Sequence, residues 1–113
     1  MRRPQVGVGL NPFLLRSAVH AGLASDGRTD PWLLRLGGDV RAAATWAGCD
    51  IVMASERLDL PDQVVVAVLE RGRRLEVYGP CVRRSMAYPG WDGLIQVLLD
   101  AAAEAAGPPI ATR

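Results

Sequence analysis

Short continuous apolar runs, typical of strands, alternate along the chain with apolar residues at helical spacing. This alternation is most regular in residues 50–81. Residues 51–54 form a short, uninterrupted apolar run, which is typical of a strand covered on both faces of a sheet. Residues 60–72 place apolar side chains at helical spacing and end in glycine, so they predict a helix. Residues 75–78 predict a second strand. The segment is therefore interpreted as a strand–helix–strand unit.

The amino-terminal part of the chain repeats this alternation. Residues 6–10 predict a strand, and the Asn-Pro pair at 11–12 predicts a helix start, because proline suits the first helical position. Residues 32–36 fit either a short helix or a strand. The glycine pair at 37–38 favours the strand, since glycine is costly inside a helix. Residues 40–47 predict an alanine-rich helix.

The clearest helix in the chain is predicted over residues 90–106, where apolar residues form a wide stripe. A Gly-Pro-Pro sequence stops it, and residues 107–113 are expected to be a frayed tail. About four strand–helix repeats fit into 113 residues. They predict one α/β domain, residues 1–113, built as a small three-layer αβα sandwich with a mainly parallel sheet of about four strands.

Composition and charge indicate which binding partners and which cellular compartment are expected. Half of the residues are apolar, 22% are charged and the net charge is +1, so no general attraction to nucleic acid or to anionic membranes is expected. No apolar run approaches the roughly 18 residues that span a bilayer. Pro4 follows the basic start without an apolar segment, so no signal peptide is predicted. Cys49 and Cys81 are expected to be free thiols at opposite edges of the sheet, which favours the cytoplasm.

Candidate site residues follow from the predicted sheet, since open parallel sheets bind ligands at the carboxyl ends of their strands. If the four predicted strands are parallel, the loops after them share one edge. These loops contain Asn11, Gly38, Ser55, Arg83 and Arg84. The two arginines could clamp a small anion, although arginine pairs in loops are more often simply solvated. His20 has no partners at metal-ligand spacing, so neither a metal nor a cofactor is predicted.

Cys81 is the strongest candidate for a catalytic residue. It follows the strand predicted over residues 75–78, and two guanidinium groups come shortly after it. Nearby positive charge favours the thiolate, which is the nucleophilic form of cysteine. The alternative is a small apolar side chain packed beneath the loop, because free cysteine is among the most buried residue types.

One family has a similar pattern. Residues 69–72 and 75–81, together with Arg84, resemble the second half of the DsrE/TusD-like sulfur-relay proteins, and the resemblance covers roughly residues 60–103. Members of this family are compact α/β proteins that are often oligomeric. The resemblance implies that Cys81 accepts persulfide sulfur and passes it on, and that Arg84 lowers the pKa of the thiol.

Two other classes of function compete with a sulfur or thiol carrier. Residues 40–58 match the spacing of a helix-turn-helix, but the second helix would carry three adjacent large apolar residues and only one arginine, which argues against a DNA reader. A non-catalytic interaction module, such as an accessory subunit, chaperone or inhibitor, fits equally well. Self-association through apolar helix faces, or a protein partner, is expected. Whether the chain is an enzyme stays open.

Overall fold

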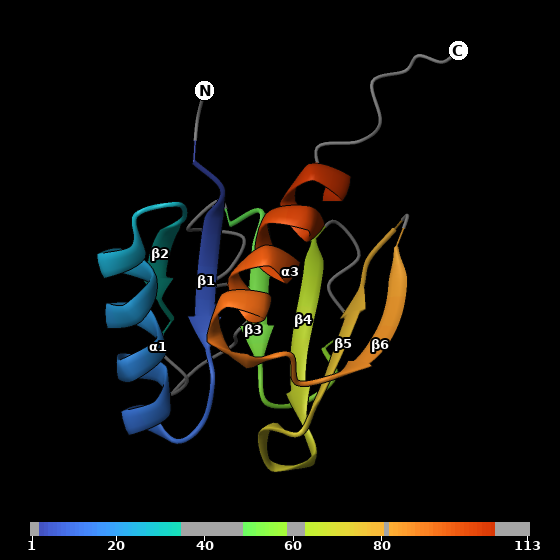
Figure 1. Ribbon diagram of the computed structural model, residues 1–113, viewed down its shortest axis with the longest axis horizontal. Coiled ribbons are helices and arrows are strands. Elements are labelled where there is room, and N and C mark those ends of the chain that lie inside the picture. The colour runs from blue at the N-terminus through green and yellow to red at the C-terminus, as the bar shows by residue number, and fades with distance from the viewer. Residues whose placement is uncertain (1–2, 35–48, 59–62, 81, 106–113) are drawn as a thin grey trace.

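A computed structural model describes residues 3–34, 49–58, 63–80 and 82–105, which form a mixed sheet with helices packed on it (Figure 1). The predicted α/β class is confirmed. The elements in chain order are β1 (Gln5–Gly9), α1 (Phe13–Asp26), β2 (Asp30–Leu33), β3 (Ile51–Ala54), β4 (Val64–Leu69), the short 3-10 helix η1 (Glu70–Gly72), β5 (Arg74–Tyr78), β6 (Arg83–Ala87) and α3 (Gly90–Ala105). The helix predicted over 40–47, the tail over 107–113, Gly38 and Cys81 lie outside the described residues.

The sheet has six strands in the order β2-β1-β3-β4-β5-β6, so the prediction of about four mainly parallel strands is wrong. The first four strands in this order are parallel, whereas β4, β5 and β6 form an antiparallel meander. The reason is the length of the β4–β5 connection. Only four residues, 70–73, separate the two strands, and a parallel pair needs a crossover of about a dozen residues or more.

The helix predicted over residues 60–72 is also wrong, because the described part of this range consists mainly of β4 followed by the η1 turn. The sequence of β4, VVVAVL, is rich in β-branched valine, which favours extended backbone. Val64 and Val66 pack on one face of the sheet and Val65 packs on the other. An apolar run that is buried on both sides has no clear period of two, so its spacing alone does not separate strand from helix.

Most other predicted elements are confirmed. Strands stand where residues 6–10, 51–54 and 75–78 predicted them, and α3 closely matches the predicted helix over 90–106. The ambiguous run over residues 32–36 begins within the strand β2, and residues 35 and 36 lie outside the described part of the chain. The first helix begins after Pro12, which takes the N-cap position that the Asn-Pro pattern assigned to Asn11, and it ends at the left-handed Gly27.

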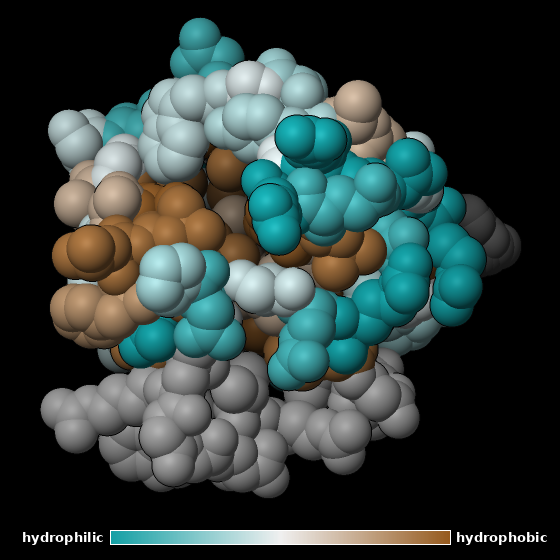
Figure 2. Space-filling model, turned by 90° about the horizontal axis from the view of Figure 1, so that it is seen from below, coloured by the Kyte–Doolittle hydropathy of each residue, from teal (hydrophilic) through white to brown (hydrophobic). Residues whose placement is uncertain are grey.

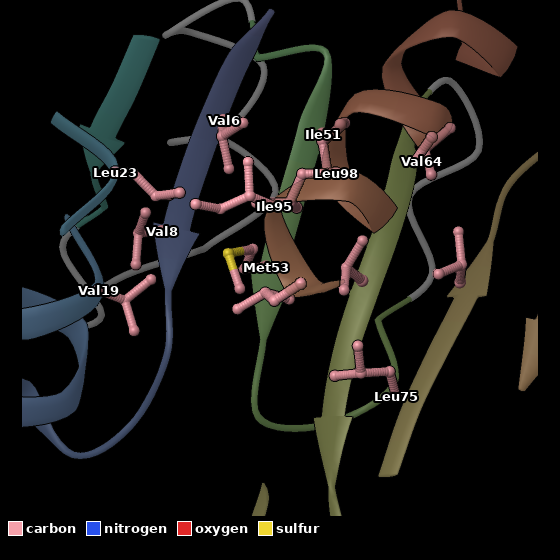
Figure 3. Close-up of a cluster of buried hydrophobic side chains, with 14 of the residues drawn as sticks. Val6, Val8, Val19, Leu23, Ile51, Met53, Val64, Leu75, Ile95 and Leu98 are labelled. Carbon is pink, nitrogen blue, oxygen red and sulfur yellow. The ribbon is translucent and has the colours of Figure 1, made fainter. Parts of the chain in front are cut away.

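Both described helices cover the same face of the sheet (Figure 1). Figure 3 shows Val19 and Leu23 of α1 and Ile95 and Leu98 of α3 directed at the same layer of strand side chains as Met53. The opposite face is also buried, with a smaller cluster formed by Leu34, Cys49, Val52 and Val65. The predicted αβα sandwich requires a helix on this opposite face as well. The helix predicted over residues 40–47 lies outside the described residues, so this third layer stays a prediction. None of the described helices combines the length and the apolar character needed to cross a membrane.

Candidate ligand-binding site

The carboxyl ends of β1, β3 and β4 meet at one edge of the sheet, at the bottom of Figure 1. The strand order reverses there. From β1 the chain moves outward to β2, and it then returns past β1 to β3 and continues to β4. The connections therefore diverge between β1 and β3, and such a switch point leaves a crevice in which open α/β sheets bind ligands.

A pocket of about 760 Å³ lies at this switch point, on the face that carries the helices. Met53 of β3 and Val68 of β4 line it from the sheet, while Val19 of α1 and Leu94 of α3 line it from the helices. Figure 2 looks onto this edge, where hydrophobic surface gathers on the side of α1, hydrophilic surface gathers on the opposite side, and a recess lies between them. The pocket is therefore an apolar cavity with a polar side to its mouth.

Two aromatic residues border the pocket where β6 leads into α3. Tyr88 and Trp91 both line it, and their exposed fractions are 41% and 37%. Trp91 can lie against α1 because that helix has glycine at position 22. A Cβ atom on Gly22 would stand 2.8 Å from Cζ2 of the indole ring. The absence of a side chain at Gly22 of α1 therefore leaves room for the indole ring of Trp91 on α3, which forms part of the pocket wall.

Asn11 and Ser55, both predicted as site residues, are brought together at the rim. The backbone N–H of Asn11 donates to Oγ of Ser55 at 2.8 Å, and that hydroxyl lies 3.3 Å from the Asn11 carbonyl oxygen, to which it donates. The loops after β1 and β3 are thereby fastened to each other, as expected for two parallel strands that end at the same edge. The hydroxyl therefore both accepts from and donates to backbone groups of Asn11 at the rim.

A third part of the rim, the η1 turn after β4, was missed by the sequence analysis. Glu70, Arg71 and Gly72 line the pocket and have φ angles of 52°, 57° and 85°. All three angles are in the left-handed region, which only glycine adopts without cost. The prediction of a helix across residues 60–72 hid this turn. Glu-Arg-Gly between two apolar runs is a hairpin signal that could have revealed it.

Arg83 and Arg84 lie at the other end of the sheet. Because β5 runs antiparallel to β4, its carboxyl end points away from the pocket, so the expectation that all candidate loops share one edge is wrong. Both arginines belong to β6, not to a loop, and both are exposed. Arg84 Nη2 lies 2.8 Å from Oε1 of Glu104 on α3, so this guanidinium has a carboxylate partner.

A second recess, of about 310 Å³, lies beside these two arginines on β5 and β6. It also contains Glu76, whose carboxylate accepts hydrogen bonds of 2.6 and 2.7 Å from the guanidinium of Arg57. These bonds lower the pKa of Glu76. The carboxylate of Glu76 gives this recess negative as well as positive charge, so the recess is not clearly selective for anions. Binding of a small anion by Arg83 and Arg84 stays a prediction.

The described cysteine, Cys49, is a free thiol buried before β3. Burial, assisted by the negative charge of Asp50, raises the pKa of Cys49 to about 11, so it is a thiol at neutral pH. Cys81 lies outside the described residues, so the expectation that the two cysteines sit at opposite edges of the sheet stays a prediction. Within the described ranges, no group of three or more His, Cys, Asp or Glu side chains could hold a metal ion.

Fold and site together define a small α/β domain with an apolar, aromatic-walled pocket at the switch point of a mixed sheet. No family model matches this chain, and neither a curated protein nor a solved structure gives a significant match to it.

Proposed function

We propose that this chain is a non-catalytic binding domain that holds one small, mainly apolar molecule in the pocket at the carboxyl edge of β1, β3 and β4. The observation that carries the proposal is the coincidence of two features at one place. The pocket is apolar and partly aromatic, and it lies at the point where strand order reverses. Its volume of about 760 Å³ falls in the range of small-molecule sites.

The chemistry of the lining favours binding over catalysis. Among the described residues of the pocket, the hydroxyl of Ser55 is held by the backbone of Asn11 and has no base beside it. The titratable side chains of the lining, Glu70, Arg71 and Tyr88, are exposed at the mouth. Nucleophilic catalysis requires an activated nucleophile held against a base, and the lining supplies no such pair.

The test uses N-phenyl-1-naphthylamine, an uncharged probe whose fluorescence rises in apolar sites. Leu15 lines the pocket from α1 and is 41% exposed, so Leu15→Trp should fill the cavity without disturbing the core. We expect this variant to weaken probe binding at least about tenfold, the loss of 1.4 kcal/mol or more. Leu14→Trp is the matched control, because Leu14 is the preceding residue, is 79% exposed and does not line the pocket.

Saturable binding that is lost in Leu15→Trp and kept in Leu14→Trp supports the proposal. No saturable binding to the wild-type chain, or equal binding to both variants, contradicts it. Circular dichroism of each variant confirms that the helices are intact.

A protein-interaction module remains a second candidate, favoured by one observation. Phe13 and Leu14 expose 57% and 79% of their surface in the first turn of α1, beside the pocket. Exposed apolar side chains of this kind mark surfaces that a partner or a second copy covers. Sedimentation over a range of concentrations tests self-association. A dimer that Leu14→Glu disrupts would support this candidate, and a monomer at all concentrations would count against self-association.

The sulfur-relay hypothesis stays a prediction, with a cytoplasmic location as its expected setting. It depends on Cys81, which lies outside the described residues. Thiol titration tests it, because an ordinary cysteine pKa would remove its chemical basis.

A further inference from the structure

We infer that the molecule bound in the pocket carries a single anionic group, a carboxylate, sulfonate or phosphate ester, and that Arg71 binds this group at the mouth. The inference rests on the proposed function. It assigns the chemical class of the ligand, an amphipathic acid, and gives Arg71 a specific role in recognition.

The first argument is the lack of a partner for Arg71. Its side chain lines the pocket and is exposed, and it makes no hydrogen bond or ion pair with another described residue. A guanidinium presents five N–H donors in a planar fork that matches a carboxylate or a phosphate. Beside an otherwise apolar cavity, such a group has donors to offer to a ligand.

The second argument is the charge balance of the mouth. Glu70 is the carboxylate of the lining, and its Oε2 lies 3.8 Å from Nε of Arg74. Arg74 therefore offsets the charge of Glu70, which leaves the positive charge of Arg71 uncompensated. An anionic ligand group would offset this charge, whereas a cationic group would be repelled by Arg71.

The third argument is the start of α1, where Pro12 and Leu15 line the same pocket. This helix has no side-chain cap and no acidic residue in its first turn. The partial positive charge of its amino end is thus not neutralised by its own residues, in contrast to α3, which has Asp92 in its first turn. Arg71 and the amino end of α1 therefore both make the electrostatic potential at the mouth of the pocket more positive.

The backbone of the η1 turn provides the fourth argument. Glu70 and Arg71 both adopt left-handed φ angles, of 52° and 57°, although neither is glycine. Residues other than glycine adopt this conformation rarely, and it is found preferentially at ligand clamps and other functional sites. Here it holds Arg71 at the mouth of the pocket. In the resulting arrangement the apolar body of the ligand lies against Met53, Val68 and Trp91, and its acidic group stays at the mouth.

The experiment compares two probes that differ by one charged group. N-phenyl-1-naphthylamine is uncharged, and 8-anilinonaphthalene-1-sulfonate has the same aromatic body with a sulfonate. Both are titrated into the wild-type chain, Arg71→Asn and Arg73→Asn. Asparagine tolerates the left-handed region, so Arg71→Asn removes the charge without adding strain. Arg73 belongs to the same loop but does not line the pocket, so Arg73→Asn controls for the general loss of one positive charge.

We expect Arg71→Asn to weaken sulfonate binding roughly three- to tenfold, as for a partly exposed charge pair, and to leave binding of the uncharged probe unchanged. Arg73→Asn should change either affinity by less than about twofold, because Arg73 does not line the pocket and its exposed charge is screened. The two probes should displace each other.

An equal effect of Arg71→Asn on both probes, or no effect on either, overturns the inference while the proposed function stands. Independent binding of the two probes, without displacement, also overturns it. Failure of the uncharged probe to bind in the pocket removes the proposed function itself, so the two failures are distinguishable.

Discussion

At the scale of single residues, Cys49 illustrates how surroundings govern chemistry. Cys49 is 6% exposed, and its sulfur lies against Gly7. A Cβ atom added to Gly7 would stand 2.8 Å from the sulfur of Cys49. The absence of a side chain at Gly7 therefore provides the space that the thiol fills. Sequence showed only that a cysteine precedes a predicted strand, which did not distinguish a reactive thiol from a packed one.

This burial predicts a pH dependence of stability. The pKa of Cys49 is about 11 in the folded chain and near 9 in the unfolded chain, so the folded state keeps the proton over a range in which the unfolded state releases it. The contribution of Cys49 is complete below pH 9 and is lost as the pH rises toward 11, on the order of 2 kcal/mol.

The measurement is urea unfolding of the wild-type chain and Cys49→Ala between pH 7 and pH 11. The free-energy difference between them should shift in favour of the alanine variant above pH 9. Tyrosines titrate in both proteins and cancel in the difference. A difference that stays constant with pH would show that the thiol is not held in its protonated form.

At the scale of elements, the contact between α1 and α3 depends on Gly22 and Trp91. Glycine is among the weakest helix formers, and its presence within α1 is explained by the indole ring beside it. The sequence predicted α3 from its apolar stripe and the start of α1 from the Asn-Pro pair at 11–12. It did not predict this contact, because a stripe shows which face is buried but not which residue of another helix meets it.

The contact predicts a coupling between the two positions. In a Trp91→Leu background, Gly22→Ala should stabilise the chain by about 1 kcal/mol, because alanine favours the helix. With the indole present, the added methyl group meets Cζ2 at 2.8 Å and the gain should be lost. A double-mutant cycle in urea measures the coupling. Equal effects of Gly22→Ala in both backgrounds would show that the ring moves aside without cost.

At the scale of the whole molecule, the reversal from parallel to antiparallel strands at β4 separates two candidate regions. Asn11, Ser55 and the η1 turn line the pocket, whereas Gly79 and Arg83 lie at the opposite end of the sheet. The carboxyl end of β5 and the amino end of β6 therefore lie away from the pocket.

This separation predicts that the two regions are functionally independent. Arg83→Asn and Arg84→Asn should leave the affinity for N-phenyl-1-naphthylamine unchanged within about twofold, since neither position is among the lining residues. Leu15→Trp provides the positive control in the same titration. A large loss of affinity in either variant would mean that the end of the sheet beyond Tyr78 communicates with the pocket.

The sequence alone determined the α/β class, the strands around residues 6–10, 51–54 and 75–78, and the helices α1 and α3. These elements are encoded by local apolar patterns and by glycine and proline at their ends. It also placed Asn11 and Ser55 at a common edge, because consecutive parallel strands end on the same side.

Only the tertiary structure decided that residues 64–69 form a strand and that β5 runs back along it. A run buried on both faces has no period that identifies it, and its conformation depends on neighbours distant in the sequence. The direction of β5 depends on a four-residue turn with left-handed backbone, which local hydrophobicity does not record. That one reversal put Arg71 at the pocket and directed Arg83 and Arg84 away from it.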